Sequence, residues 1–503
     1  MEYKSCVVIG AGIGGLSAAA LLAQKGLKVT VLEANPSLVG GLATPVPVGE
    51  TACSFGPRYV WNFREGEFGN RFLKKLGLDK KIKFVRLDKD GFDHIYHPDF
   101  KEPFKVPADL DLYVKKLGQL FPSEKKNIEH FFKACKRHYD VLAYLLDNNY
   151  QFKKTYKLVF PLIRRFWSRP MHVLTFVRFY SSTVTQVFDK YDISLEARQI
   201  ITSNLVIFNE DLDNLSFHPF AYLTLAYLNY SCFPQGGMGS IIDNLVQVLE
   251  DNGGELLKGE KVVNITSAKN TKKIESVKTE SGKTYNADLF ISNIDPSCLN
   301  RIYSGENEQK PSSHHEFNHG KSVYTVFMEV NERIDLSKAF GTRNIWSWEP
   351  LEQAKNGETS NEALTSIYYN SPSESYAEKP ENSRHGSISL SFTYPYEDVE
   401  WDEDLLKDYI VKSIKERFLP ELQSEDINAW NIYAPKDIEN EFNATGGNIY
   451  GKALTVKNFN RRITHQTNYD NLFQVGQYAP VGAVVNVMQS AAYVYSTLYD
   501  EEI

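Results

Sequence analysis

A glycine-rich turn near the start of the chain constrains the fold more than any other feature of the sequence. Gly10, Gly12 and Gly15 form the pattern G-x-G-x-x-G. A short apolar run suited to a buried parallel strand precedes the turn, and an Ala- and Leu-rich stretch with helical character follows it. Glu33 ends the next apolar run, 18 residues past Gly15. This order predicts a β-α-β unit that binds a dinucleotide.

Each residue type in this unit has a physical role in holding a pyrophosphate. Gly10 allows the tight turn, Gly12 lets the backbone approach the phosphates, and Gly15 lets the helix pack closely on the strand. The helix N-terminus supplies unpaired N–H groups and the positive end of its dipole. Glu33 can accept hydrogen bonds from the ribose hydroxyls, and its charge disfavours a 2′-phosphate, as in NADP.

A second glycine pair distinguishes FAD from NAD. Gly40 and Gly41 follow Glu33 by seven and eight residues, an arrangement typical of FAD proteins. No second G-x-G-x-x-G opens a helix later in the sequence, as the nicotinamide site of a disulfide-reductase type of enzyme would require. We therefore expect one bound dinucleotide, FAD.

The amino-acid composition limits the kinds of partner and the cellular location that we expect for the chain. With 42% apolar and 24% charged residues, the sequence is that of an ordinary globular protein. Its net charge of -7 argues against non-specific binding of nucleic acid. The five cysteines are scattered without a C-x-x-C pair, which fits a reducing cytosol. No apolar run is long enough to span a bilayer, and we expect no signal peptide and a cytoplasmic location.

Nucleotide-binding patterns at the start, middle and end of the sequence predict domains that are interleaved along the chain. We expect an α/β fold in which a Rossmann-like FAD-binding domain is joined to an antiparallel-sheet substrate domain with a helical cap. The FAD-binding domain is assigned to residues 1–105, 232–300 and 425–503. The substrate and cap domain is assigned to residues 106–231 and 301–424.

Six stretches, in order along almost the whole chain, resemble the family of FAD-dependent phytoene desaturases, carotene isomerases and retinol saturases. They are residues 7–44, FGPRY at 55–59, FPQGGMGSIIDNL at 233–245, GGELLKGEKVVNI at 253–265, ADLFISNIDP at 287–296, and NLFQVGQYAPVGAVVNVMQSA at 471–491. The resemblance implies an FAD-dependent oxidoreductase that desaturates, isomerises or saturates C=C bonds of a long apolar carotenoid- or retinoid-like substrate.

The resemblance also implies roles for single positions. The Val262 backbone meets the adenine, and Gly476 lies beside the ribityl chain. Val484 and Val485 begin a helix at the flavin pyrimidine edge, where the helix dipole stabilises reduced flavin by roughly 0.3–2 kcal/mol. The expected cofactor-binding residues are Gly10, Gly12, Ile13, Gly14, Gly15, Glu33, Ala34, Gly40, Gly41, Leu42, Pro57, Arg58, Val262, Asn293, Gly476, Gln477, Val484 and Val485.

Three departures from the family pattern leave the reaction open among desaturation, isomerisation and saturation. Leu42 follows the second glycine pair where the family has Arg, Cys53-Ser54 replaces an aromatic-acid pair, and Pro480–Ala483 replaces P-G-G-G. Arg58 either faces the flavin, holds a polar end of the substrate or has a purely structural role, and no acid/base pair stands out. Two other readings remain: an amine-oxidase-like flavoprotein, and a lipid carrier that keeps FAD only structurally.

The segment His315–His319 matches H-E-x-x-H, the zinc signature of many proteases. That chemistry needs both histidines on one face of a helix, whereas this copy lies in a polar loop between Pro311 and Gly320. We therefore expect no metal. No G-x-S-x-G elbow is present, which excludes an α/β-hydrolase.

Residues 148–188 form the most unusual segment of the chain. These 41 residues contain no Asp or Glu and seven Lys or Arg, interleaved with Phe, Trp, Met and Leu. Such a composition is typical of a segment that lies on a membrane surface. The alternative is a lid whose apolar face points inward and whose basic face points outward. We expect peripheral membrane association through this segment, with an apolar lipid-like substrate.

Overall fold

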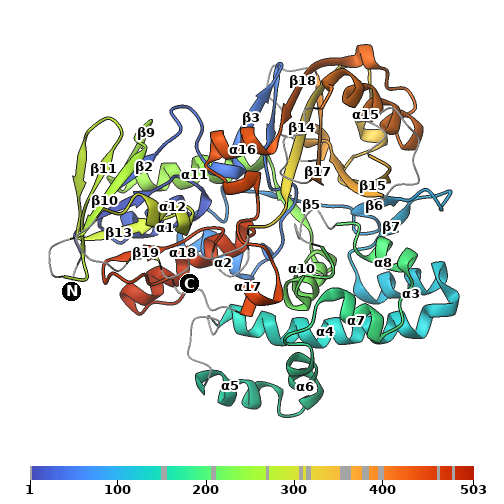
Figure 1. The fold of residues 1–503 in the computed structure, drawn as a ribbon, viewed down its shortest axis with the longest axis horizontal. Helices are drawn as coiled ribbons and strands as arrows, with labels where there is room; N and C mark the ends of the chain where they lie inside the picture. The colour runs from blue at the N-terminus through green and yellow to red at the C-terminus, as the bar shows by residue number, and fades with distance from the viewer. Residues whose placement is uncertain are drawn as a thin grey trace.

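Two β-sheets lie side by side in the computed structural model, and helices cover both (Figure 1). The structure describes residues 3–148, 156–204, 211–267, 271–304, 310–312, 319–351, 364–375, 385–394, 401–460, 465–478 and 482–503. The fold confirms the expected combination of a nucleotide-binding α/β unit with an antiparallel sheet and a helical cap.

The first sheet has five parallel strands that come from distant parts of the sequence. Its order is β19 (Leu472–Gln474), β13 (Leu289–Ser292), β1 (Ser5–Ile9), β2 (Lys28–Glu33) and β9 (Glu255–Lys258). Parallel strands all end at the same edge of a sheet, so the chain segments that follow β1, β2, β13 and β19 meet there.

Helices pack tightly on this sheet because α1 carries small side chains. Helix α1 (Ile13–Gln24) connects β1 to β2 and is buried from Ile13 to Ala23. It lies against α11 (Gly237–Asp251) and α18 (Val484–Tyr499). The alanines of α1 allow a close approach of these helix backbones, which brings the first turns of α1 and α18 to the same edge of the sheet.

The second sheet has seven strands and lies to the right in Figure 1. Its order is β18 (Ile427–Tyr433), β14 (Ser322–Val330), β17 (Gly386–Tyr394), β16 (Thr365–Asn370), β15 (Asn344–Glu349), β6 (Asp93–Tyr96) and β7 (Phe104–Val106). All its neighbouring pairs are antiparallel except β15 with β6. Helix α15 (Glu403–Arg417) contributes to the apolar core on one side of the sheet.

Three strands of this second sheet consist of residues that the sequence assigned wholly or partly to the other domain. Strands β6, β7 and β18 fall within residues 1–105 and 425–503, or straddle their ends, and these ranges were assigned to the FAD-binding domain. Backbone pairing nevertheless joins them to the substrate sheet. Sheet membership depends on long-range pairing, which the sequence of a single strand does not reveal, whether the strand is as short as β7 or as long as β18. The two-domain division remains a proposal with these strands reassigned.

Smaller elements complete the two sheets. The chain also forms a three-stranded antiparallel sheet and two antiparallel pairs of strands, and only the first of these pairs joins strands that are neighbours in sequence. They are β10 (Val262–Ser267), β11 (Ile274–Thr279) and β12 (Thr284–Asn286), then β3 (Pro45–Val48) with β4 (Thr51–Ser54), and β5 (Phe84–Arg86) with β8 (Cys232–Pro234).

A helical cap lies below the sheets in Figure 1. Its long helices α4 and α10 pack against each other, and the pair α5–α6 lies at the outer edge of α4. The cap helices are α3 (Leu110–Leu120), α4 (Lys125–Asp147), α5 (Tyr156–Phe166), α6 (Pro170–Arg178), α7 (Val184–Lys190), α8 (Leu195–Ile201) and α10 (Phe217–Asn229).

A buried histidine pair joins α4 to α10. His138 Nε2 lies 2.6 Å from His218 Nδ1, and His218 Nε2 lies 2.9 Å from the carbonyl oxygen of Tyr180. The network fits two neutral rings in which His138 donates to His218 and His218 donates to the carbonyl. Burial lowers the pKa of both rings, and it lowers the pKa of His218 to about 4.

The cap should therefore lose stability in mild acid. The unfolded chain takes up protons on these histidines near pH 6.5, whereas in the folded chain His218 does so only near pH 4 and the pKa of His138 also lies well below its ordinary value. Stability is fully present above pH 6.5 and falls as the pH drops towards 4. We expect the thermal midpoint to fall over this range, and to fall less in His138→Gln, which can still donate to His218 but does not titrate. The same slope in both proteins would contradict this origin, because the other buried histidines are common to both.

Candidate functional site

A cavity of about 510 Å³ lies between the two sheets. One part of its wall consists of the ends of β1, β2 and β13 together with the first turns of α1 and α18. Another part includes side chains from β15, β16 and β17, and from α10 of the cap. The cavity therefore joins the edge of the parallel sheet to the substrate sheet.

Most of the residues expected from sequence to bind the cofactor line this cavity. They are Gly10, Gly12, Ile13, Gly14, Glu33, Ala34, Gly40, Gly41, Leu42, Pro57, Arg58, Val262, Asn293, Gln477, Val484 and Val485. Gly15 and Gly476 do not line it. A Cβ on Gly15 would collide with the carbonyl oxygen of Gly10, and one on Gly476 would collide with Asn293 Oδ1. Both glycines thus act behind the wall, by permitting close packing.

The two glycine turns form one narrow cradle. Gly40 N donates to the carbonyl oxygen of Ala11 at 3.0 Å, which ties the second turn to the first. A Cβ on Gly12 would lie 2.6 Å from Asn293 Nδ2, and a Cβ on Gly14 would lie 2.7 Å from Asn293 Oδ1. Gly40 has a φ of 112°, which side chains other than glycine rarely adopt. A cradle of bare backbone fits the close approach of a pyrophosphate.

Glu33 lies at the edge of this cradle with spare acceptor capacity. Its Oε2 accepts a hydrogen bond from Ala11 N at 2.7 Å, and its Oε1 accepts one from Asn35 N at 2.8 Å. Each oxygen keeps a further lone pair for a ligand hydroxyl. Burial raises the pKa of Glu33, and the hydrogen bonds from backbone N–H groups oppose that rise. The geometry suits the ribose role expected from sequence.

Two helix N-termini face the cavity. Gly12 is the N-cap of α1, and Ile13 is its first residue. Val484 and Val485 begin α18, and all four residues line the cavity wall. Two sets of unpaired N–H groups and two positive dipole ends are therefore available to phosphates and to a negatively charged ring.

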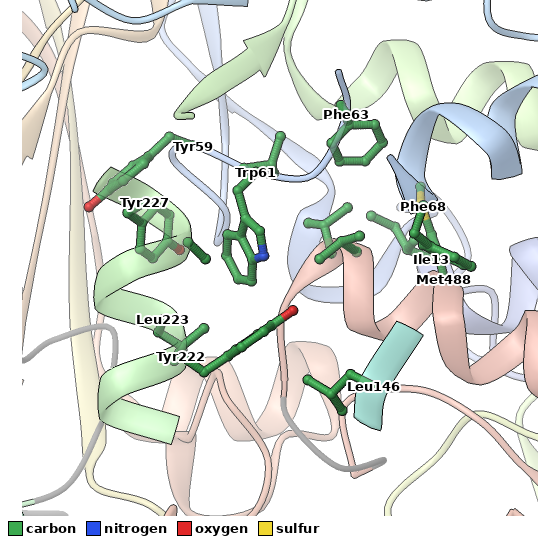
Figure 2. Packing of buried hydrophobic residues seen from close by; sticks show 14 of the residues in the cluster. Ile13, Tyr59, Trp61, Phe63, Phe68, Leu146, Tyr222, Leu223, Tyr227 and Met488 are labelled. Carbon is green, nitrogen blue, oxygen red and sulfur yellow. The ribbon is translucent and has the colours of Figure 1, made fainter. Parts of the chain in front are cut away.

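The far part of the cavity is aromatic. Tyr59, Trp61, Tyr227, Trp346 and Tyr368 line it, and each is at most 7% exposed. The ring centroids of Tyr59 and Tyr227 are 4.4 Å apart, those of Trp61 and Tyr227 4.7 Å, and those of Trp346 and Tyr368 4.5 Å. Figure 2 shows Tyr59 and Trp61 beside Tyr227 of α10. We call these five residues the aromatic wall.

Sequence reasoning missed the aromatic wall. The 13% share of Phe, Trp and Tyr suggested large apolar cavities but assigned no positions. Tyr59 and Trp61 lie in the loop just after Arg58. This loop was the only local indication in the sequence of where the aromatic wall lies. Trp346, Tyr368 and Tyr227 come from β15, β16 and α10, and only the tertiary fold brings them together.

Arg58 is a buried cation in the cavity wall. It is 7% exposed, its Nη1 donates to the carbonyl oxygen of Ser54, and its guanidinium lies 5.3 Å from the ring centre of Phe327. Its Nε and Nη2 have no hydrogen-bond partner within the described ranges. A buried donor without an acceptor costs about 1–3 kcal/mol or more, so Arg58 suits a ligand that brings an acceptor group.

Only part of the H-E-x-x-H pattern lies within the described residues. His315 to Asn318 lie outside the described residues, whereas His319 Nε2 lies 3.0 Å from Asp295 Oδ2. Within the parts of the chain that are described, no three His, Cys, Asp or Glu side chains gather in a way that could hold a metal ion. The expectation of no metal stays a prediction.

No helix in the described ranges is long and apolar enough to cross a membrane.

Comparisons with known proteins find relatives over most of the chain. The family model for flavin-containing amine oxidoreductases matches residues 13–480. A 1-hydroxycarotenoid 3,4-desaturase from Flavobacterium sp. is 24% identical over 493 residues, which cover 94% of each chain. An all-trans-retinol 13,14-reductase from Danio rerio is 23% identical over 95% of this chain and 82% of its own. A prolycopene isomerase from an Oncidium hybrid cultivar is 26% identical over 58% of this chain and 48% of its own.

Solved structures share the fold over almost the whole chain. An oxidoreductase from Methanosarcina mazei has a TM-score of 0.66 at 17% identity and covers 98% of this chain and 99% of its own. A putrescine oxidase has a TM-score of 0.66 at 14% identity and covers 99% of both chains. Together with the glycine cradle, the family match establishes that this chain belongs to the flavin-containing amine oxidoreductases and is an FAD-dependent oxidoreductase.

Proposed function

We propose that this flavoprotein desaturates, isomerises or saturates C=C bonds in a long apolar polyene or isoprenoid of carotenoid- or retinoid-like chemistry. The observation that carries this proposal is the aromatic wall. Five buried rings around one end of the cavity offer flat apolar surfaces, which suit a conjugated chain. The names of the desaturase, reductase and isomerase relatives support a substrate of this class.

In this proposal FAD binds along the cavity in one orientation. Glu33 and Val262 bind the adenosine end, Gly12 and Gly14 lie against the pyrophosphate, and the first turn of α18 lies at the flavin. FAD, when bound, supplies the acceptor or donor of a hydride. The chain's own residues position the substrate against the flavin and exclude water, because the aromatic wall leaves few polar groups at that end of the cavity.

Arg58 weighs against an amine substrate. A protonated amine at the aromatic wall would approach the buried guanidinium of Arg58, and like charges repel strongly where water is excluded. The likeness to putrescine oxidase concerns the fold alone. An uncharged polyene meets no such penalty, and one that carries an oxygen atom can accept hydrogen bonds from the two Arg58 nitrogens that have no partner within the described ranges.

We also propose that helices α5 and α6 attach the protein to the surface of an anionic bilayer. Their exposed apolar side chains include Phe160 at 71%, Ile163 at 59%, Trp167 at 78% and Val177 at 65%. The basic Arg164, Arg165, Arg169 and Arg178 are interleaved with them. An inward-facing lid would bury the apolar side chains, so their exposure favours the membrane. Phe166 differs from that pattern, because it is 4% exposed and packs on Tyr144 and His172.

The first prediction concerns the ribose ligand. Glu33→Ala should weaken FAD binding by about 1.5–3 kcal/mol, which is the range for a hydrogen bond to a charged group. Fluorescence titration of FAD into the deflavinated protein measures the change. Glu255→Ala is the matched control, because Glu255 lies on the neighbouring strand β9, accepts from Thr30 Oγ1 and does not line the cavity. Equal affinities in the two variants would show that Glu33 does not bind the ribose.

The second prediction concerns the substrate class. Under anaerobic conditions, a carotenoid or retinoid should bleach the oxidised flavin spectrum or be isomerised by the reduced enzyme, and putrescine should do neither. Stopped-flow absorbance and chromatography of the extracted polyene measure these outcomes. Reduction by the amine alone would favour the amine-oxidase reading. Binding of polyenes without reduction, isomerisation or saturation would favour a carrier.

The third prediction concerns the membrane. Phe160→Ser/Trp167→Ser should reduce co-sedimentation with anionic vesicles, because the apolar insertion is lost. Arg164→Glu/Arg165→Glu should reduce it by at least about 2 kcal/mol, since each basic residue near the surface contributes about 1 kcal/mol.

Leu195→Ser/Leu405→Ser is the matched control, because both leucines are exposed on other helices, at 67% and 51%. If all three variants sediment like the wild type while remaining yellow, α5 and α6 are not the attachment site.

A further inference from the structure

A carboxyl group lies directly behind the aromatic wall. Asp93, on β6, is 5% exposed and does not line the cavity. Its Oδ2 accepts a hydrogen bond from the Tyr59 hydroxyl at 3.3 Å, and its Oδ1 accepts one from Asn344 Nδ2 at 3.1 Å. Tyr59 itself lines the cavity, so its side chain connects the carboxyl group to the substrate space.

A second tyrosine helps to hold this arrangement. The Tyr368 hydroxyl donates to Asn344 Oδ1 at 2.7 Å, which orients the amide so that its nitrogen points to Asp93. Tyr368 also belongs to the aromatic wall, but it reaches Asp93 only through Asn344. The network therefore reaches the cavity directly through Tyr59 and indirectly through Tyr368, and Trp346 of the aromatic wall also acts on the pKa of Asp93.

Within the described ranges, none of the ion pairs includes Asp93. No cation there neutralises its charge. Side chains alternate along a strand, so His94 points to the opposite face, where Arg343 and Lys105 act on its pKa. On the Asp93 side, the facing titratable groups are tyrosines: Tyr59, Tyr113 of α3 and Tyr227 of α10.

This environment favours a protonated carboxyl group near neutral pH. Burial raises the pKa of Asp93 to about 7, although the hydrogen bonds from Asn344 and Tyr59 oppose the rise. A carboxylate that is buried without a cation destabilises the folded protein. Buried acids of this kind are common at sites that transfer protons. Asp93 can therefore both accept and release a proton at physiological pH.

The cavity offers few other proton acceptors. No histidine lines it within the described residues, and its carboxylates there are Glu33, Asp295 and Glu441. Glu33 belongs to the cradle. Asp295 is bound by His319, Thr445 and Tyr478. Burial raises its pKa, but the hydrogen bonds from His319, Thr445 and the backbone of Ser297 outweigh burial and hold the pKa at about 2. None of these three belongs to the aromatic wall.

We propose that Tyr59 is the catalytic residue that exchanges the substrate proton, and that Asp93 is the positioning residue that takes up and returns the hydroxyl proton of Tyr59. This inference rests on the proposed reaction at C=C bonds. It adds an acid/base pair that is not recognisable in the sequence, because Tyr59 and Asp93 are 34 residues apart and meet only in the fold.

Desaturation removes one hydride and one proton from neighbouring carbons of the substrate. FAD, when bound, would supply the hydride acceptor, and a substrate carbon that has lost a hydride makes a C–H bond on the neighbouring carbon acidic. Tyr59 Oη takes that proton while its own hydroxyl proton passes to Asp93 Oδ2. The electron pair of the broken C–H bond becomes the second bond of the new C=C. For saturation, the same two transfers run in reverse, and Asp93 starts protonated.

The test is the pH profile of flavin reduction by a polyene in single turnover, with FAD content and polyene affinity measured in parallel. For desaturation, the wild-type rate should rise about tenfold per pH unit below 7 and level off above it, because Asp93 must be ionised to accept a proton. Asp93→Asn and Tyr59→Phe should both be slower by about 10²–10⁴-fold and lose this profile, while FAD content stays unchanged.

Tyr369→Phe is the matched control, because it removes a buried hydroxyl from the next position of β16, on the opposite face of the sheet, and does not line the cavity. It should keep the profile. Asp93→Glu, which restores a carboxyl group, should recover part of the rate. A preserved pH profile in Asp93→Asn, or equal rates in Tyr59→Phe and Tyr369→Phe, would overturn the inference and leave the proposed reaction standing.

A wild-type protein that turns over no polyene would overturn both proposals. A second measurement covers the case in which Asp93→Asn does not fold. Infrared difference spectra of the wild-type holoprotein should contain a protonated carboxyl band that titrates near pH 7 and is altered in Tyr59→Phe. Absence of such a band near pH 7 would contradict the role of Asp93.

Discussion

Close approach of backbone at one edge of the parallel sheet is the constraint on which the rest of this structure depends. The segments that follow β1, β2, β13 and β19 meet there, and Asn293 lies within reach of Gly12, Gly14 and Gly476. Because these positions carry no side chain, the turns can be tied together by the hydrogen bond from Gly40 to Ala11. The cradle for FAD is the space that this packing leaves.

The cavity combines two walls with different physical chemistry. At the cradle, backbone N–H groups, helix N-termini and Glu33 suit a charged and hydroxylated ligand. At the aromatic wall, water is excluded and every electrostatic interaction is stronger. The same burial that suits an apolar substrate raises the pKa of Asp93, and it leaves two nitrogens of Arg58 without a partner within the described ranges. The proton transfer and the substrate class that we propose therefore both depend on desolvation at this end.

The sequence predicted those parts of the site that are local in the chain. The glycine turns, Glu33 and the start of α18 each depend on a short pattern, and all of them lie at the cavity or directly behind it. Their roles in binding FAD stay predictions. The aromatic wall and Asp93 depend on pairing of β6 with β15 and of β15 with β16, between segments up to 251 residues apart. Strand β6 has only four residues and carried no signal. Similarly, composition identified residues 148–188 as unusual but could not separate the buried Phe166 from the exposed Phe160.

A crystal structure of the yellow, flavin-bound protein would test the central claim most directly. We expect a ribose hydroxyl of FAD within hydrogen-bonding distance of Glu33, the pyrophosphate against Gly12 and Gly14, and the flavin ring between the first turn of α18 and the aromatic wall. Tyr59 should then face the space beside the flavin and keep its hydrogen bond to Asp93. An adenine bound among Tyr59, Trp346 and Tyr368, or FAD outside this cavity, would contradict the assignment of the two walls.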